Sequence, residues 1–223
     1  MKKTKISSYK EGSKALKKQL SELISPNAFG VFNSDAEELN KEHTFILKRK
    51  VGDKAPNFRL LNTGNEPVNL YDVLKTKKVV LTFYKGTWCP YCNLMLSHYE
   101  TALPEIQKAG ATILAISPQT PEESLNIKEK NNVQFEILSD NGNIVSKEFT
   151  TIHKIPEKSL TKMTELGTDY DSYYSDEASE LPIPATFIIE KDGTISFAKT
   201  EGGDYRNRVE SSEIINALHK NKS

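Results

Sequence analysis

Residues 78–92 read KVVLTFYKGTWCPYC, and this stretch decides the fold. Its first half, KVVLTFY at 78–84, is a nearly continuous run of β-branched and apolar residues, which is typical of a strand covered on both faces. A stretch of helical periodicity follows from about Cys89 to Lys108, and we expect Gly110 to end it. The sequence therefore predicts a buried strand that leads directly into a long helix, with two cysteines at the junction.

The segments around this junction alternate between strand and helix patterns. Gly64-Asn65 indicates a turn between two short strands, and Lys191-Asp192-Gly193 indicates a hairpin turn. The other expected elements are, in chain order, a strand at 112–117, a helix opening at Pro121, a strand at 135–138, a helix at 140–149, paired strands at 185–190 and 194–200, and a helix at 211–218. This order predicts an α/β domain whose central mixed β-sheet carries helices on both faces.

Residues 1–50 are polar and helical in pattern. Leu16 and Leu20 belong to an apolar stripe at helical spacing, and a second helix is expected to begin near Ser34 as its cap. We expect an N-terminal helical extension over 1–50 that packs on the rest of the chain or forms a dimer contact. The domain itself is expected over 51–223, with a polar, tyrosine-containing insertion at about 150–181 that forms a lid or loop.

The composition argues against several classes of partner, although it leaves local charged patches open. Lysine plus arginine and aspartate plus glutamate each number 30, so no global field favours nucleic acid or an anionic membrane. No apolar run approaches the roughly 20 residues of a transmembrane helix, and no apolar segment follows the basic start. Two cysteines in 223 residues do not resemble a secreted disulfide framework. We expect a cytoplasmic protein with neither a nucleic-acid nor a membrane partner.

The Cys89-Pro90-Tyr91-Cys92 segment is a candidate redox site. On the first turn of a helix, free N–H groups and the helix dipole stabilise a thiolate and can lower a thiol pKa from about 8.5 towards about 4–7. Pro90 fits this turn because its missing N–H is not required there. Lys85, four residues before Cys89, adds positive charge nearby. We expect Cys89 and Cys92 to be catalytic, with Trp88, Pro90 and Tyr91 positioning the substrate.

The cysteine pair has two other interpretations. A zinc site needs four ligands, but no second cysteine pair exists, and the four histidines, His43, His98, His153 and His219, lack ligand spacing. Inert structural cysteines are the other alternative, although a disulfide that closes so short a loop adds little stability. We expect no metal and no cofactor, and we place His98 at the surface or in a partner contact.

A second signal lies at 181–186, LPIPAT, directly before an expected strand. A proline there, in a chain with a Cys-x-x-Cys pair, suggests a cis peptide bond between Ile183 and Pro184 that faces the sulfurs. Such a bond would expose the backbone of Ile183 for pairing with an extended substrate segment. The alternative is two trans prolines that end a loop.

Together, four segments resemble one family: VGDKAPNF at 51–58, FYKGTWCPYCN at 83–93, AISPQTP at 115–121 and LPIPATF at 181–187. They resemble the peroxiredoxin-like branch of the alkyl hydroperoxide reductase/thiol-specific antioxidant superfamily, over residues of about 10 to 218. The resemblance implies a three-layer, thioredoxin-like fold with peroxiredoxin-type insertions and an antioxidant role in cell redox homeostasis. By family habit it also implies a homodimer.

The resemblance departs from the family pattern at the site. The Pro-x-x-x-Thr-x-x-Cys signature of peroxiredoxins places the peroxidatic cysteine on Cys92, but Cys89 occupies the threonine position and Lys85 the proline position. The family's later arginine falls near Pro184. Phe83 occupies the position of the buried acid of thioredoxins.

Arg206 and Arg208 follow the Gly202-Gly203-Asp204-Tyr205 segment and could replace the lost arginine. A solvated loop is the favoured interpretation of this segment.

Two mechanisms follow, of which the peroxidase is favoured. In it, the Cys92 thiolate becomes a sulfenic acid on a hydroperoxide, Cys89 condenses with it, and a thioredoxin-like or other dithiol reduces the resulting disulfide. In the alternative, a thiol–disulfide exchanger, Cys89 attacks a substrate disulfide and Cys92 resolves the mixed disulfide. A redox sensor or binding module without turnover is the third hypothesis.

Overall fold

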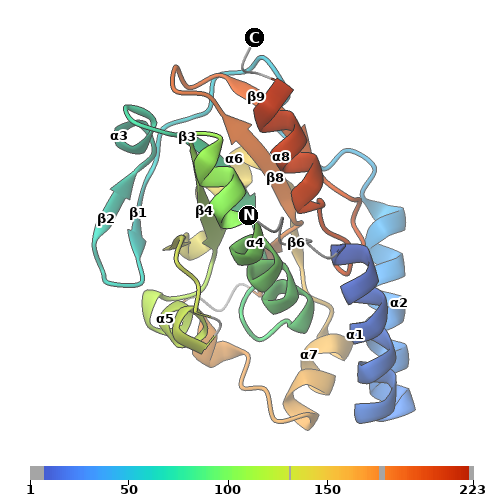
Figure 1. The fold of residues 1–223 in the computed structure, drawn as a ribbon. Helices are drawn as coiled ribbons and strands as arrows, with labels where there is room; N and C mark the ends of the chain where they lie inside the picture. The colour runs from blue at the N-terminus through green and yellow to red at the C-terminus, as the bar shows by residue number, and fades with distance from the viewer. Residues whose placement is uncertain (1–7, 131, 176–178, 221–223) are drawn as a thin grey trace.

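The computed structural model describes residues 8–130, 132–175 and 179–220. At its centre lies a seven-stranded mixed sheet in the order β2-β1-β5-β4-β3-β8-β9 (Figure 1). Its strands are β1 (Arg59–Asn62), β2 (Pro67–Asn69), β3 (Lys78–Phe83), β4 (Ala111–Ser117), β5 (Glu136–Ser139), β8 (Ala185–Ile189) and β9 (Ile195–Lys199). The β3–β4 and β4–β5 pairs are parallel, whereas β8 pairs antiparallel with both β3 and β9. The expected central mixed sheet is confirmed.

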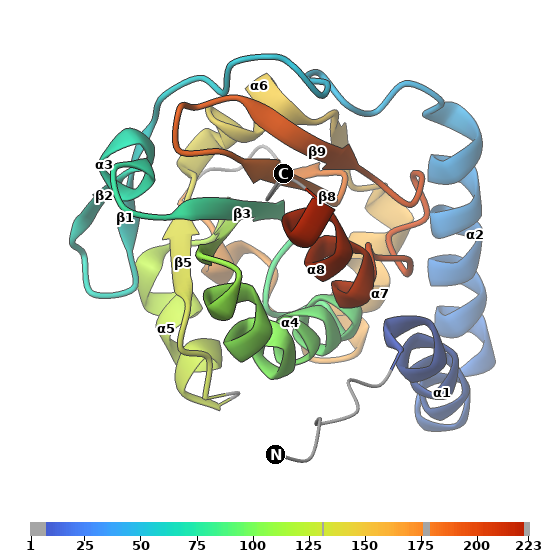
Figure 2. The ribbon, with the colours of Figure 1, turned by 45° about the horizontal axis from the view of Figure 1, so that its top comes forward.

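Helices cover both faces of this sheet (Figure 2). The flanking helices are α3 (Leu70–Leu74), α4 (Pro90–Lys108), α5 (Pro121–Lys130), α6 (Ser146–Phe149) and α8 (Ser211–Lys220). One apolar cluster joins Val80 of β3 to α4 and α8, and a second joins Leu81 of β3 to α3 and α6. Because alternate residues of β3 face opposite clusters, the strand is buried on both sides, as its apolar run predicts.

The single helix expected over 140–149 is wrong. The chain instead forms a 3-10 turn η1 (Asn141–Asn143) and the short helix α6. Gly142 has a φ of 72°, which interrupts the helix, and the buried Asp140 carboxylate accepts the backbone N–H groups of Val145 and Ser146 at 3.0 and 2.7 Å. The Asp140 side chain therefore caps a second helical start within the segment.

Two helices precede the sheet: α1 (Tyr9–Leu23) and α2 (Pro26–Glu42). The expected helix start at Ser34 is wrong, because Ser34 lies inside α2. That helix begins at Pro26, and the Ser25 hydroxyl accepts the N–H of Ala28 at 3.2 Å. The division of the chain into an extension at 1–50 and a domain at 51–223 stays a prediction.

The segment expected as an insertion forms a small unit of its own. Its strands β6 (Ile152–Lys154) and β7 (Glu180–Pro182) pair antiparallel and enclose α7 (Glu157–Glu165) and a 3-10 turn, η2 (Asp171–Tyr173). Helix α7 packs against α2, where the Lys158 ammonium lies 2.9 Å from the Glu38 carboxylate. The insertion and α2 therefore lie side by side, as Figures 1 and 2 show.

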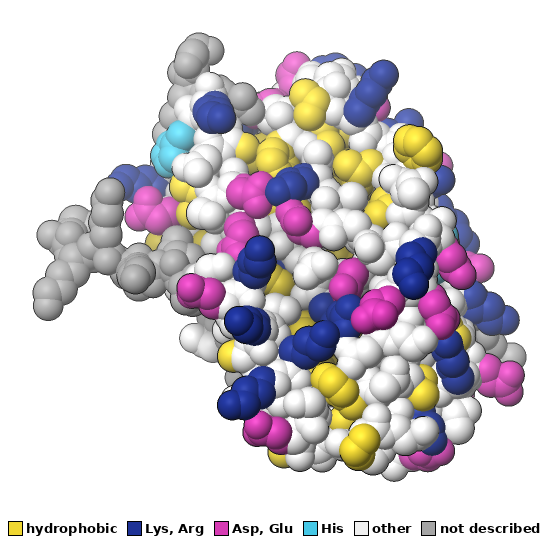
Figure 3. All heavy atoms as spheres, turned by 90° about the vertical axis from the view of Figure 1, so that its right-hand side faces the viewer, with side chains coloured by type: hydrophobic (Ala, Val, Ile, Leu, Met, Phe, Trp, Pro, Cys, Tyr) yellow, Lys and Arg dark blue, Asp and Glu magenta, His cyan; other side chains and the backbone are white. Residues whose placement is uncertain are grey.

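Charged side chains of both signs are interspersed on the face of the molecule that carries α2 (Figure 3). This pattern agrees with the zero formal charge of the sequence. None of the helices in the described part of the chain is long and apolar enough to cross a membrane.

Candidate active site

The two cysteines lie at the junction between the end of β3 and the start of α4. Cys89 occupies the N-cap position of α4, and Cys92 lies in its first turn, with its N–H donated to the Cys89 carbonyl at 3.0 Å. Both thiols are free and buried, with exposed fractions of 2% for Cys89 and 0% for Cys92. The reactive segment is therefore part of the core, and access to the sulfurs depends on what surrounds them.

Arg208 contacts the Cys92 sulfur directly. Its Nη2 donates to the Sγ of Cys92 at 3.2 Å, while Nη1 donates to the carbonyls of Asn207, at 2.7 Å, and Tyr205. The side chain is only 5% exposed. The solvated-loop interpretation is therefore wrong for Arg208, because its side chain is buried and its two terminal nitrogens contact two backbone carbonyls and a thiol inside the protein.

These contacts shift the pKa values of the two thiols in opposite directions. Burial raises the pKa of the Cys92 thiol, but the hydrogen bond from Cys89 and the charge of Arg208 outweigh burial, so its pKa lies well below the usual range. Backbone hydrogen bonds from Gly86 and Lys85 act in the same direction. The hydrogen bond to Cys92, with burial, raises the pKa of Cys89 well above its usual value. The arrangement favours a Cys92 thiolate that accepts a hydrogen bond from the protonated Cys89 thiol.

A second cation, Lys85, lies on the Cys89 side of the pair. It is 3% exposed, and its ammonium stands over the rings of Tyr205 and Trp88, 3.7 and 5.5 Å from their centroids. Burial lowers the pKa of Lys85, whereas attraction to Cys89 and to Asp35 of α2 raises it. The buried carboxylate near this site therefore comes from α2 rather than from β3, where Phe83 packs in the core.

Gln119 holds the loop that precedes the cysteines. Its Oε1 accepts the Thr87 N–H at 2.7 Å, and its Nε2 donates to the Thr87 hydroxyl at 3.0 Å. On the other side, the Asn93 amide donates to the Thr87 carbonyl at 2.8 Å. All three polar groups of Thr87 are thus engaged, which fixes the loop between β3 and α4. Gln119 belongs to the AISPQTP segment, but its role was not predicted from the sequence.

The insertion covers the same loop. The Trp88 indole N–H donates to the Tyr174 hydroxyl at 2.6 Å, and that hydroxyl donates to the Lys85 carbonyl at 3.1 Å. The ring of Tyr170 packs edge-on against Trp88 with centroids 5.5 Å apart. A Cβ on Gly86 would lie 2.6 Å from the indole nitrogen and 2.8 Å from the Tyr174 hydroxyl, so this position needs glycine. The tyrosines of the insertion therefore lock the cysteine loop in place.

The expected cis bond at Ile183–Pro184 is wrong, because all peptide bonds among the described residues are trans. The Ile183 N–H donates to the Thr151 carbonyl at 2.9 Å, and its own carbonyl accepts the Thr150 hydroxyl at 2.8 Å. Only Ile183 and Pro184 separate β7 from β8. Because the insertion already occupies the Ile183 backbone, that backbone is not free to pair with a substrate in this structure.

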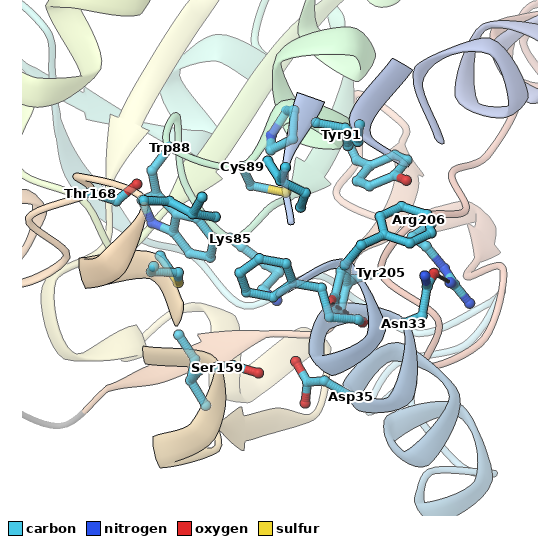
Figure 4. Close-up of a pocket in the computed structure, with 18 residues that line it drawn as sticks. Asn33, Asp35, Lys85, Trp88, Cys89, Tyr91, Ser159, Thr168, Tyr205 and Arg206 are labelled. Atoms are coloured by element: carbon cyan, nitrogen blue, oxygen red, sulfur yellow. Dashed lines mark hydrogen bonds between the residues drawn. The ribbon is translucent and has the colours of Figure 1, made fainter. Parts of the chain in front are cut away.

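A cavity of about 160 Å³ opens beside Cys89 (Figure 4). Trp88, Pro90 and Tyr91 lie in its wall with Cys89, whereas Cys92, Ile183 and Pro184 do not line it. The remaining lining residues are Leu20, Ile24, Phe29, Phe32, Asn33, Asp35, Lys85, Ile155, Ser159, Met163, Leu166, Thr168, Tyr205 and Arg206. Three of the residues expected to position a substrate thus surround one cavity, and the other two lie elsewhere.

His98 is buried rather than at the surface, with an exposed fraction of 7%. Its ring packs edge-on against Tyr9 at 6.0 Å, and its Nε2 lies 3.8 Å from the Glu210 carboxylate. The packing of α1 on α4 explains this burial. Within the described ranges, no group of three or more His, Cys, Asp or Glu side chains could hold a metal ion.

Comparison with known proteins gives matches of two kinds. The profile of the AhpC/TSA family matches residues 51–198. Peroxiredoxin Bcp of Escherichia coli (strain K12) is 31% identical over 146 residues, which cover 66% of this chain and 82% of that protein. Chloroplastic peroxiredoxin Q of Sedum lineare is 28% identical over 164 residues, covering 74% and 75% of the two chains.

Solved structures resemble the fold. Peroxidoxin BcpB of Mycobacterium tuberculosis superposes with a TM-score of 0.61 at 19% identity, covering 78% of this chain and 99% of that one. A PrxQ mutant of Xylella fastidiosa gives a TM-score of 0.59 at 20% identity, with coverage of 78% and 98%. These similarities establish the thioredoxin-like architecture with peroxiredoxin-type additions.

Proposed function

The chain belongs to the AhpC/TSA family, as a thiol-dependent peroxidase, and from this premise we propose that Cys92 is its peroxidatic cysteine and Cys89 its resolving partner. The observation that carries the assignment is the 3.2 Å contact between Arg208 Nη2 and Cys92 Sγ. Of the two sulfurs, Cys92 has the lowered pKa, and the thiolate is the form that attacks a peroxide. We assign to Arg208 the role of the family's later arginine, whose position in this sequence falls near Pro184.

In the first step, the Cys92 thiolate attacks one oxygen of the hydroperoxide and the O–O bond breaks. The sulfur becomes a sulfenic acid, and the departing oxygen leaves as water or an alcohol after it takes up a proton. The Arg208 guanidinium lies where the negative charge moves from sulfur to oxygen, so it can stabilise that charge in the buried site.

In the second step, the Cys89 thiolate attacks the sulfur of the Cys92 sulfenic acid, the S–O bond breaks and the disulfide forms, while the departing hydroxide takes up the proton that Cys89 has lost and leaves as water. Cys89 must first lose its proton, and its raised pKa stems above all from its hydrogen bond to Cys92. Oxidation of Cys92 removes the anionic acceptor of that bond. The charges of Lys85 and Arg208 then remain, and both lower the pKa of Cys89. An external dithiol, thioredoxin-like or other, completes the cycle.

One observation favours the second candidate function, thiol–disulfide exchange. Cys89 lines the cavity and Cys92 does not, so a substrate disulfide in the cavity would meet Cys89 first. In that case Cys89 is the nucleophile and Cys92 the resolving thiol. The peroxidase remains our proposal because the lowered thiol pKa belongs to Cys92.

A coupled assay separates these functions: NADPH consumption with thioredoxin reductase, thioredoxin and hydrogen peroxide or an alkyl hydroperoxide. We expect Cys92→Ser to abolish peroxide consumption and Cys89→Ser to retain a single turnover. Trp88 is the only tryptophan and adjoins Cys89, so its fluorescence can follow the first oxidation without any reductant. Reduction of insulin disulfides with no consumption of peroxide would replace our proposal by the exchanger. Absence of turnover with either substrate would leave a redox sensor.

We also propose the setting in which this chemistry occurs. The balanced charge and the two cysteines support a cytoplasmic protein, and the family supports a dithiol reductant and a homodimer. The proposed domain covers 51–223, of which the family profile matches 51–198, and the helices of 1–50 are an addition to it.

A further inference from the structure

The cavity beside Cys89 is built mainly by segments that lie outside the β3–α4 junction. Its walls come from α1 and α2 on one side and from the insertion, with Ile155, Met163 and Leu166, on the other (Figure 4). Only one of the two sulfurs, that of Cys89, faces this space. A molecule bound there meets Cys89 first, so the cavity suits chemistry on Cys89 rather than attack on a peroxide by Cys92.

The size and lining of the cavity define what it can hold. Most of its residues are aliphatic or aromatic, and its volume is about 160 Å³. An apolar protein cavity of about 150 Å³ binds benzene. A four-carbon dithiol has about as many heavy atoms as benzene. The cavity is therefore matched in size and lining to a small apolar molecule.

The charged groups inside the cavity suit an arriving thiolate. Lys85 and Asp35, which are 3% and 5% exposed, line it together. Burial raises the pKa of Asp35 and lowers that of Lys85, whereas attraction between them favours the charged form of each. The Lys85 ammonium is held over Tyr205 and Trp88, on the Cys89 side of the cysteine pair. It can therefore stabilise the negative charge of a second sulfur that approaches Cys89. Asp35 balances that charge, so a thiol with fixed charges of its own gains little.

We propose that this cavity binds a low-molecular-weight dithiol with an apolar carbon chain, which reduces the Cys89–Cys92 disulfide by attack on Cys89. This inference rests on the proposed function in that the disulfide is the product of the peroxidase cycle. One thiolate of the dithiol bonds to Cys89 Sγ, the Cys89–Cys92 bond breaks, and its electron pair leaves on Cys92. The second thiolate of the dithiol then attacks the dithiol sulfur that is bonded to Cys89, and Cys89 is released as a thiolate. The dithiol leaves as a cyclic disulfide, so two electrons pass to the protein.

The ease with which each sulfur leaves also favours attack on Cys89, the sulfur that is accessible from the cavity. In thiol–disulfide exchange, the sulfur whose thiol has the lower pKa leaves faster. The Arg208 guanidinium stabilises a leaving Cys92 thiolate, whereas a leaving Cys89 thiolate would lack that contact. Attack on Cys89 from the cavity therefore places the departing charge on the better leaving group.

The test compares two dithiols that differ by two hydroxyl groups: 1,4-butanedithiol and dithiothreitol. The protein is oxidised to the disulfide with diamide, and its reduction is followed by Trp88 fluorescence and by thiol counting. Each rate is divided by the rate of the same dithiol with a small reference disulfide. We expect butanedithiol to be favoured by about ten-fold or more, because the hydroxyls lose their water in the cavity.

Two partly exposed wall residues and a neighbour outside the cavity provide matched variants. Ile24→Glu and Leu166→Glu should remove most of the preference, while Leu23→Glu, at a residue 78% exposed and absent from the lining, should keep it. Circular dichroism verifies the fold of each variant. The wild-type ratio tests the inference even if a wall variant fails to fold.

Equal normalised rates for the two dithiols would overturn the inference, and so would a preference that both wall variants retain. Mass spectrometry of a monothiol adduct trapped on Cys92 rather than Cys89 would overturn it as well. The peroxidase is tested separately by oxidation of the reduced protein with hydrogen peroxide. Because diamide forms the disulfide in any case, failure of the peroxide reaction leaves the dithiol comparison intact.

Discussion

The Arg208 guanidinium lies 3.2 Å from the Cys92 sulfur, although 116 residues separate them in the chain. Arg208 is held there by the carbonyls of Tyr205 and Asn207, just before α8, while Cys92 is held by the first turn of α4. The two helices pack on the same face of the sheet. The charge of the reactive sulfur therefore depends on the docking of the last helix.

Replacement of Arg208 by methionine should raise the pKa of Cys92, because the cation that lowers it is lost while its burial remains. Less thiolate is then present at neutral pH. A hydrogen bond to a charged group contributes about 1.5–3 kcal/mol, so kcat/KM for peroxide should fall roughly 10- to 100-fold. The pH midpoint of Cys92 alkylation, followed by mass spectrometry, should move upward. Arg49→Met, which removes a surface ion pair with Glu148, is the control. An unmoved midpoint in the Arg208 variant contradicts this prediction.

Gln119→Ala should weaken both stability and activity. The substitution leaves the buried Thr87 N–H without its acceptor, which costs about 1–3 kcal/mol of unfolding free energy. It also frees the loop that carries the cysteines, so kcat should fall. Urea unfolding and steady-state kinetics measure the two effects, with the exposed Gln19→Ala as control. If the variant is as stable and active as the wild type, Gln119 does not hold the loop.

Gly86→Ala should disturb the contact between the insertion and the cysteine loop. The new Cβ would overlap the Trp88 indole and the Tyr174 hydroxyl, and such overpacking costs about 1–3 kcal/mol. Trp88 fluorescence should shift, because its hydrogen bond to Tyr174 is displaced. Gly30→Ala, in α2 with no atom within 4 Å of the added Cβ, should instead be neutral or stabilising. Similar behaviour of the two variants would show that the overlap is relieved at no cost.

Acid should destabilise the protein through His153. Burial, with the nearby charge of Lys85, lowers the pKa of His153 to about 3, whereas the unfolded chain has an ordinary histidine pKa of about 6.5. Between these values the unfolded state binds the proton first. The unfolding free energy should therefore be fully retained above about pH 6.5 and fall below it by up to about 1.4 kcal/mol per pH unit.

The variant His153→Gln should flatten this pH dependence between about pH 6.5 and pH 3, while any constant difference from the wild type persists above pH 7. Chemical denaturation at a series of pH values measures both profiles. An unchanged slope in the variant would assign the acid sensitivity to other groups.

The main elements followed from local patterns. The apolar run at 78–84 and the helical stretch after it form β3 and α4, and their predicted bounds agree within one or two residues. Both elements could be predicted because burial on both faces and the start of a helix depend on residues that are neighbours in the sequence. Two helix boundaries were wrong. At Ser34 and in the 140–149 segment, a nearby residue, Ser25 or Asp140, provides a cap that the periodicity does not reveal.

The site was predicted less completely than the fold. The cysteine pair and the residues beside it follow from the CPYC motif, and three of them line the cavity together with Cys89. Arg208 and Asp35 lie far from the cysteine pair in the chain. Both are charged residues with polar sequence neighbours, and such a local sequence favours a position in solvent. The cis bond was expected from a motif, but the backbone pairing of Ile183 with the insertion accommodates a trans bond.

The amino-acid sequence by itself determined that two thiols stand at the start of a helix that follows a buried strand, since both features depend on neighbouring residues. Only the tertiary structure decided which thiol carries the charge and which one faces a cavity. The physical reason is that electrostatic attraction and solvent exclusion act through distances in space. The guanidinium of Arg208, the ammonium of Lys85 and the walls from α2 and α7 come within range of the sulfurs only once the chain has folded.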